Sequence, residues 1–166
     1  ETSKPPVPES SLHYLLTTPF RYPPLLYGSR FGRVHELSLF YGGLDEQTTF
    51  AESAYYRLVY LYSMEGESPA KPLTGQHTLF TANYVSDFAI QLHKAPFVEF
   101  RTELTDPGSY SLTQQLGTDM REAGVRVFEF ESARLADGIN VALFDSTGFA
   151  STQPESMNQV VSQTSW

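Results

Sequence analysis

Five side chains in this sequence have types and positions suited to chemistry on an anionic substrate. Arg30 and Arg33 lie three residues apart in a glycine-containing segment, and Tyr41 ends the apolar run that follows them. Glu52 lies near the start of a segment with helical periodicity, and Ser132 follows the letters FEFE. A guanidinium can grip a phosphate or carboxylate with paired hydrogen bonds, a carboxylate can stabilise a positively charged sugar transition state, and a tyrosine can stack on a flat ring.

Each of these residues also has an ordinary structural explanation. Residues 49–52, TFAE, match a capping box, in which the glutamate bonds back to a backbone N–H at the start of a helix. Arg30 could form a surface ion pair with Glu36, which would be worth about 1 kcal/mol or less. Tyr41 could be a core tyrosine with its hydroxyl at the rim, and Ser132 could be a strand-end or turn serine. On the residues alone, both interpretations stay open.

The distribution of charge favours a small anion over a nucleic acid as the partner. The chain has 166 residues and a formal net charge of −8, which disfavours binding to a phosphate polymer. Within residues 11–44, however, Arg21, Arg30 and Arg33 stand against Glu36 alone, so this segment carries a charge of +2. The alternative is that these are three ordinary surface arginines.

Several functional classes are excluded by what the sequence lacks. It has no cysteine, which rules out disulfides, thiolate-bound metal and a cysteine nucleophile. It contains no phosphate-binding loop, no GxGxxG, no HExxH and no GxSxG, and its histidines have no metal-ligand spacing. No apolar run is long enough to cross a bilayer, and no signal peptide is visible. We therefore predict no metal, no membrane association and a cytoplasmic location.

The order of predicted elements indicates an α+β fold with a mixed or antiparallel β core and flanking helices, rather than a regularly alternating parallel sheet. Residues 1–166 are predicted to form a single domain, with a linker-like segment at 1–10 and a polar, flexible tail from 151 that can add a last strand at 158–161. The first helix is expected to bury Phe50, Ala54, Leu58 and Leu61 on one face. The expected elements are an extended segment at 18–30, strands at 37–41, 77–85, 88–93, 125–130 and 140–144, helices at 49–64 and 111–124, and a turn at 137–138.

Taken in order, several of these stretches resemble the RES-domain family, which is named for an arginine, a glutamate and a serine. The matching stretches cover about residues 14–145, and their order and spacing are more specific than any single motif. The family arginine is assigned to Arg30 because it directly precedes the aromatic Phe31. The stretches are GSRFGR (28–33), LFYGG (39–43), TTFAESAYYR (48–57), YSLTQQLGTDMREAG (110–124) and FEFESARLADGINVALF (128–144).

This resemblance implies an ADP-ribosyltransferase-like fold and a toxin that consumes NAD⁺, neutralised by an Xre-type helix-turn-helix antitoxin. Arg30, helped by Arg33, would hold the anionic or ribose side of NAD⁺, and Tyr41 would pack against the nicotinamide. Glu52 would stabilise the oxocarbenium-like transition state as the nicotinamide–ribose bond breaks, and Ser132 would position that ribose or the glutamate. Water, phosphate or a protein side chain would then capture the ribosyl cation.

Two other functions stay open at this point. The first is an ADP-ribosyltransferase that modifies a specific target protein, because hydrolysis and transfer share the same bond cleavage. The second is a non-catalytic module that binds a nucleotide or a protein partner. For all three functions the expected partners are NAD⁺ and proteins rather than a nucleic acid or a membrane.

Overall fold

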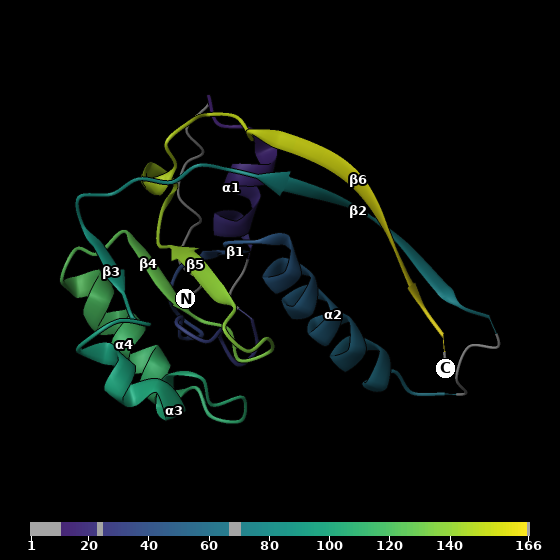
Figure 1. Cartoon of the computed structure of the whole chain (residues 1–166), viewed down its shortest axis with the longest axis horizontal. Coiled ribbons are helices and arrows are strands. Elements are labelled where there is room, and N and C mark those ends of the chain that lie inside the picture. Colours follow the sequence, from purple (N-terminus) through teal and green to yellow (C-terminus); the bar gives the residue numbers. More distant parts are fainter. Residues whose placement is uncertain (1–10, 23–24, 67–70, 166) are drawn as a thin grey trace.

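The computed structural model describes residues 11–22, 25–66 and 71–165 and combines helices with two β-sheets (Figure 1). The linker-like segment predicted at 1–10 lies outside the described residues. In chain order the elements are α1 (Tyr14–Arg21), β1 (Phe40–Gly43), α2 (Glu46–Tyr62), β2 (Leu73–Thr81), β3 (Ala89–Gln91), a 3₁₀ turn (Phe97–Phe100), α3 (Arg101–Leu104), α4 (Ser111–Glu122), β4 (Val127–Glu131), β5 (Ile139–Leu143), a second 3₁₀ turn (Ser146–Gly148) and β6 (Ser156–Thr164).

The main sheet has the strand order β1-β5-β4-β3, and β2 and β6 form a separate two-stranded ribbon. Strand β5 pairs with β1 and β4 in antiparallel fashion, whereas β3 pairs with β4 in parallel. The ribbon is antiparallel over nine residues of each strand. The predicted α+β class with a mixed β core is therefore confirmed.

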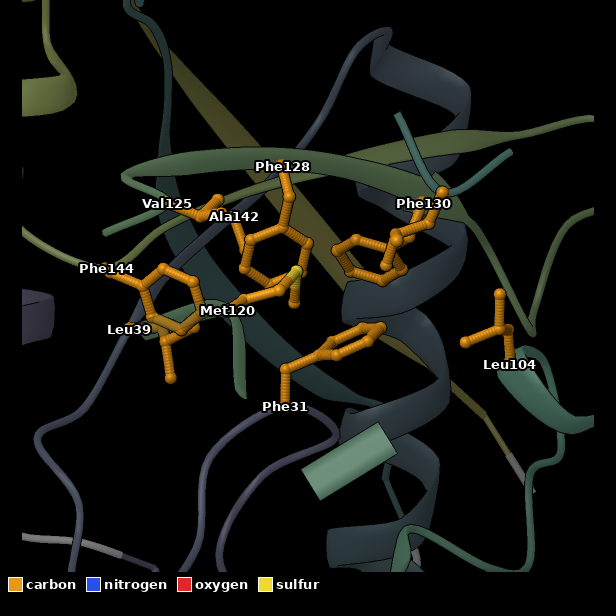
Figure 2. Packing of buried hydrophobic residues seen from close by; sticks show 10 residues of the cluster. Phe31, Leu39, Leu104, Met120, Val125, Phe128, Phe130, Ala142 and Phe144 are labelled. Atoms are coloured by element: carbon orange, nitrogen blue, oxygen red, sulfur yellow. The ribbon is translucent and has the colours of Figure 1, made fainter. Parts of the chain in front are cut away.

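The two faces of the main sheet carry different apolar clusters because side chains alternate along each strand. On one face, Phe128 and Phe130 of β4 pack edge-on against Phe31, with ring centroids 4.8 Å apart in both pairs. Figure 2 shows Met120 of α4 and Leu104 of α3 completing this cluster. The opposite face is covered by α1 and includes Phe20, Val127, Val141 and Leu143.

Most predicted elements match the structure, with shifted ends. The strand predicted at 37–41 begins later, at Phe40, and includes the two glycines that were expected to follow it. Helix α4 stops before Gly124, whose φ of 78° suits a glycine at a helix end. The turn at 137–138 is present, with Asp137 at a φ of 61°. The other matches are β2, β3, β4, β5 and the last strand β6, which is longer than the predicted 158–161.

The extended conformation predicted for 18–30 is wrong at its start, because α1 runs through residue 21 with Pro19 inside it. The His13 side chain accepts a hydrogen bond from the Leu15 N–H at the start of this helix. Leu16 and Phe20, one helical turn apart, are both buried beneath it. Tertiary burial therefore outweighs the loss of one backbone donor at the proline.

Helix α2 and the β2–β6 ribbon extend together from the main sheet to the same far end of the molecule (Figure 1). At that end Arg57 of α2 donates to the Thr164 hydroxyl and to the Leu73 carbonyl, both at 2.9 Å. The predicted apolar face of the helix is wrong in part, since Phe50 and Leu58 are exposed and only Leu61 of the large residues is buried. Beyond its first turns the helix contacts Arg134 through Tyr55 and the ribbon through Arg57. In the described ranges, no helix is long and apolar enough to span a bilayer.

Close contact between α4 and the segment that carries Arg30 depends on Gly117. A Cβ atom built on Gly117 would lie 2.0 Å from the Phe31 carbonyl oxygen, far inside a normal contact. Phe31 is itself completely buried. The absence of a side chain at Gly117 is thus what lets the arginine segment rest on α4.

We expect Gly117→Ala to lower the free energy of unfolding by at least about 2 kcal/mol, because overpacking outweighs the higher helix propensity of alanine. Gly108→Ala is the matched control, since its Cβ would meet only the Asp106 carboxylate at 3.5 Å. Urea denaturation of both variants measures the difference. Equal midpoints for the two variants would show that α4 and the Phe31 segment separate without cost.

Candidate active site

Glu52 lies in the second turn of α2 and does not cap it. The helix begins at Glu46, and Asp45 is its N-cap residue. The Asp45 carboxylate accepts from the Thr48 N–H at 2.7 Å and from the Thr48 hydroxyl at 2.9 Å. The capping-box interpretation of residues 49–52 is therefore wrong, because an aspartate four residues before Thr49 starts the helix. The Glu52 carboxylate is left available for contacts with the sheet.

Two buried side chains donate hydrogen bonds to one oxygen of Glu52. The Ser132 hydroxyl donates to Glu52 Oε1 at 2.6 Å, and the Asn140 amide donates to the same atom at 2.8 Å. Ser132 and Asn140 are 8% and 5% exposed. Among the described residues, no hydrogen bond is made to Glu52 Oε2. One carboxylate oxygen is thus anchored, and the other accepts no hydrogen bond from the described residues.

The direction of the Ser132 bond follows from its other contacts. Its oxygen accepts from the Arg134 N–H at 3.0 Å and from the Leu135 N–H at 3.1 Å, at the turn that follows β4. A hydroxyl has one proton and two acceptor lone pairs, so its proton is directed to Glu52. Ser132 is therefore both a turn serine and a partner of the carboxylate, and the two interpretations of this residue are not exclusive.

Arg30 is buried, and its expected surface pair with Glu36 is wrong. The residue is 9% exposed and donates to the Leu104 carbonyl at 2.7 Å. Its guanidinium lies 5.2 Å from the centre of the Tyr110 ring. Glu36 instead accepts from the Arg33 N–H and from a hydroxyl on α4. In the described part of the chain, no carboxylate lies within ion-pair distance of the Arg30 guanidinium.

Arg134 brings a second guanidinium to the same region. It lies 3.5 Å from the centre of the Tyr55 ring and donates to the Tyr110 hydroxyl at 3.5 Å. Its Nε atom is buried and has no hydrogen-bond partner among the described residues. Burial, the adjacent Tyr110 and the Glu52 carboxylate together raise the pKa of Tyr56 to about 12. Tyr110 therefore links the surroundings of Arg30 to those of Glu52.

The Tyr41 hydroxyl forms hydrogen bonds within the protein, while the residue remains partly exposed. The hydroxyl contacts the Ser29 hydroxyl at 2.9 Å and accepts from the Phe31 N–H at 3.2 Å. Burial raises the pKa of this hydroxyl. The residue as a whole remains 38% exposed, and cavities of about 180 Å³ and about 530 Å³ both border on it. Tyr41 is thus fixed next to the Arg30 segment and borders two cavities, and the linings of these two cavities do not include Arg30, Glu52 or Ser132.

Arg33 lies apart from the Glu52 group. Its guanidinium donates to the Gln115 side chain on α4, whereas Arg30 contacts the Leu104 carbonyl and Tyr110. The structure therefore joins Glu52 directly to Ser132, brings Arg30 close through Tyr110, and turns Arg33 toward α4.

Sequence reasoning missed four residues of this group, namely Tyr56, Tyr110, Arg134 and Asn140. A signal existed for Asn140, since it is the one polar residue in the buried strand segment NVALF. Arg134 lies inside a stretch already matched to the family pattern. Tyr56 and Tyr110 also lie inside matched stretches, but nothing in the residue pattern singles them out in a chain with ten tyrosines. Among the residues that the structure describes, no cluster of three histidine, aspartate or glutamate side chains could hold a metal ion.

Comparison with known proteins gives one clear result. The family model described as the RES domain matches residues 7–162, nearly the whole chain. This range is longer than the one identified from the motifs and includes every residue of the Glu52 group. A search of the curated proteins found no match.

Proposed function

The chain belongs to the RES-domain family, and we propose that it is the toxin of a toxin–antitoxin pair that consumes NAD⁺ by cleaving the nicotinamide–ribose bond. The observation that carries this proposal is the carboxylate of Glu52, which accepts two hydrogen bonds at Oε1 and none from the described residues at Oε2. A fixed negative charge beside a sugar stabilises the positive charge that develops when its glycosidic bond breaks. A ribose hydroxyl can donate to the open oxygen and so place the sugar.

Two guanidiniums support the choice of a phosphate-bearing substrate. Arg30 lies over the Tyr110 ring and Arg134 contacts the Tyr110 hydroxyl, and neither has a carboxylate partner within the described residues. A buried cation without a partner is costly, and an anionic ligand relieves that cost. In our proposal Arg30 holds the pyrophosphate side of NAD⁺, and Arg134 adds a second positive charge between it and Glu52.

Tyr41 supports the assignment of the nicotinamide end. Its hydroxyl is engaged by Ser29 and Phe31, which prevents the ring from rotating away, while the ring borders open space. A flat pyridinium ring can pack on this tyrosine. Arg33 plays a secondary part, helping to set the local positive charge.

The proposed reaction breaks one bond and moves one electron pair. The C–N bond between ribose and nicotinamide breaks, and its electron pair goes to the pyridinium nitrogen, which leaves as neutral nicotinamide. The leaving group therefore needs no protonation. The ribosyl cation is captured by water, which loses a proton and gives ADP-ribose, or by phosphate.

Transfer of ADP-ribose to a target protein is the second candidate, since it uses the same bond cleavage with a protein side chain as acceptor. The observation that favours it is the exposure of Tyr60 on α2, which lies farther along the helix from Glu52 than Tyr56 does. Exposed aromatic residues are typical of protein-binding surfaces.

The proposed protein partner is an Xre-type helix-turn-helix antitoxin that covers the Arg30–Tyr41 region. Leu26 and Tyr27, just before the arginine segment, are 79% and 83% exposed. An exposed apolar loop beside a positive segment suits a partner segment that is both apolar and acidic.

We expect saturating NAD⁺ to weaken binding of the antitoxin to the toxin, because both would occupy the same region. Competition measured with the inactive Glu52→Gln variant tests this. An antitoxin affinity that does not change with NAD⁺ would place the partner elsewhere and would leave the enzyme assignment standing.

For the catalytic carboxylate, we expect Glu52→Gln to fold normally and to lower the rate of nicotinamide release by about 100-fold or more, the scale of losing one electrostatic stabiliser. The glutamine oxygen can still accept from Ser132 and Asn140. The control is Glu65→Gln, an exposed residue beyond α2 that should keep full activity. NAD⁺ bound but not consumed by the unaltered chain would instead favour the non-catalytic module.

For the arginines, we expect Arg30→Ala to weaken NAD⁺ binding by at least about 10-fold, because a charge-assisted hydrogen bond to an anion is lost. Arg33→Ala should weaken it by less than about 3-fold, since that side chain bonds to α4. Calorimetric titration in the Glu52→Gln background separates binding from turnover, and urea denaturation checks that both variants are folded. The reverse order would assign the family arginine to Arg33.

A further inference from the structure

We propose that Asn140 is a positioning residue for Glu52, acting with Ser132 to hold the carboxylate in one orientation. This inference deepens the proposed function, because it takes Glu52 as the group that meets the sugar cation. It assigns to Asn140 a role that neither the arginine, the glutamate nor the serine of the family motif fills.

The position of Asn140 in the sheet makes it a rigid support. It lies on β5, the strand between β1 and β4, where it is opposite Gly43 on one side and Phe130 on the other. Backbone pairing on both sides leaves this strand little freedom to shift. A side chain on a strand held in this way is a more accurate anchor than one on a loop.

Asn140 also breaks the apolar character of its strand face. Ala142 and Phe144, the next residues on that face, belong to the apolar cluster around Phe128. A buried amide without a hydrogen bond is destabilising, so a polar side chain at such a position needs a reason. The bond from the Asn140 amide to Glu52 Oε1 is that reason.

Two hydrogen bonds to one oxygen restrict the Glu52 carboxylate more than a single hydrogen bond would. Ser132 approaches Glu52 Oε1 from the turn after β4, and Asn140 approaches it from β5. A single hydrogen bond would let the carboxylate pivot about the shared atom. Two bonds from separate elements fix the position of Oε1, and their directions at its lone pairs limit how far the carboxylate can turn about that atom.

The chemistry of an amide suits this role over a broad pH range. The amide N–H₂ donates whatever the pH, whereas an aspartic acid of the same shape would donate only when protonated. The charged and titratable groups next to Glu52 are Tyr56 on the same helix, Tyr110 before α4, and Arg134 in the turn after β4. Tyrosine and arginine ordinarily titrate above about pH 9. Burial and the adjacent Glu52 carboxylate would raise the pKa of an introduced carboxyl group above its ordinary value, so this group would titrate below the tyrosines and the arginine.

The test compares Asn140→Ala and Asn140→Asp with the control Asn158→Asp, which changes an exposed asparagine on β6. We expect Asn140→Ala to lower kcat for NAD⁺ cleavage by at least about 10-fold with KM within about 3-fold, because the carboxylate is misplaced in the transition state rather than the substrate being released. The control should keep the kcat and KM of the unaltered chain.

The pH profile separates positioning from a merely structural role. At low pH the introduced aspartic acid is protonated and can donate to Glu52 as the amide does; as the pH rises it ionises and repels Glu52. The kcat of Asn140→Asp relative to that of the unaltered chain should therefore increase as the pH falls from about 8 to about 5, whereas the Asn140→Ala ratio should stay flat. A folded Asn140→Ala with unchanged kcat, or parallel profiles for both variants, would overturn the inference.

A second measurement does not depend on activity. Urea midpoints of Glu52→Ala, Asn140→Ala and the double variant form a cycle, since each single variant removes the hydrogen bond between the two side chains, and we expect the shifts to be non-additive. If the unaltered chain leaves NAD⁺ intact, the proposed function fails, and the cycle alone decides this inference. Non-additive shifts then support the coupling of Asn140 to Glu52, and additive shifts overturn it.

Discussion

The hydrogen bonds that meet at Glu52 Oε1 are the constraint on which the rest of the site depends. They join α2, the turn after β4 and strand β5 at a single atom. Each of these elements must be correctly placed for the bonds to form. Asp45 sets where α2 begins, the Ser132 turn sets where β4 ends, and the pairing of β5 on both sides sets the depth of Asn140. The Glu52 carboxylate is thus positioned by backbone structure.

Sequence patterns identified the strands and turns better than the helices. The β4–β5 hairpin was predictable because apolar runs flank an Asp-Gly pair, which is a strong local turn signal. The start of α2 was predicted too late because Thr49 and Asp45 both suit an N-cap, and only packing decides between them. Helix α1 was missed because Pro19 normally excludes a helix, whereas here burial of Leu16 and Phe20 outweighs that preference.

The contacts of the candidate site also differ in whether neighbouring residues in the sequence could predict them. The family pattern left two roles open for Ser132, positioning the ribose or positioning Glu52, and the structure joins Ser132 directly to Glu52. The surroundings of Arg30 were not predictable, because they depend on a carbonyl of residue 104 and a ring of residue 110 that no local pattern associates with it. Asn140 is the intermediate case. The sequence shows it as a polar residue in an apolar strand, but its role could be inferred only once the structure showed its hydrogen bond to Glu52.

The spacing of Glu52, Ser132 and Asn140 along the chain has a consequence for when the site is assembled. Ser132 and Asn140 are 80 and 88 residues from Glu52, so their contacts close very long loops. Such contacts form late in folding, because closing a long loop costs less entropy once local structure has already ordered part of the chain. During synthesis from the N-terminus, α2 emerges long before β5 can reach it. A nascent chain therefore carries the glutamate without its supports, and the assembled carboxylate exists only once β5 has left the ribosome and folded.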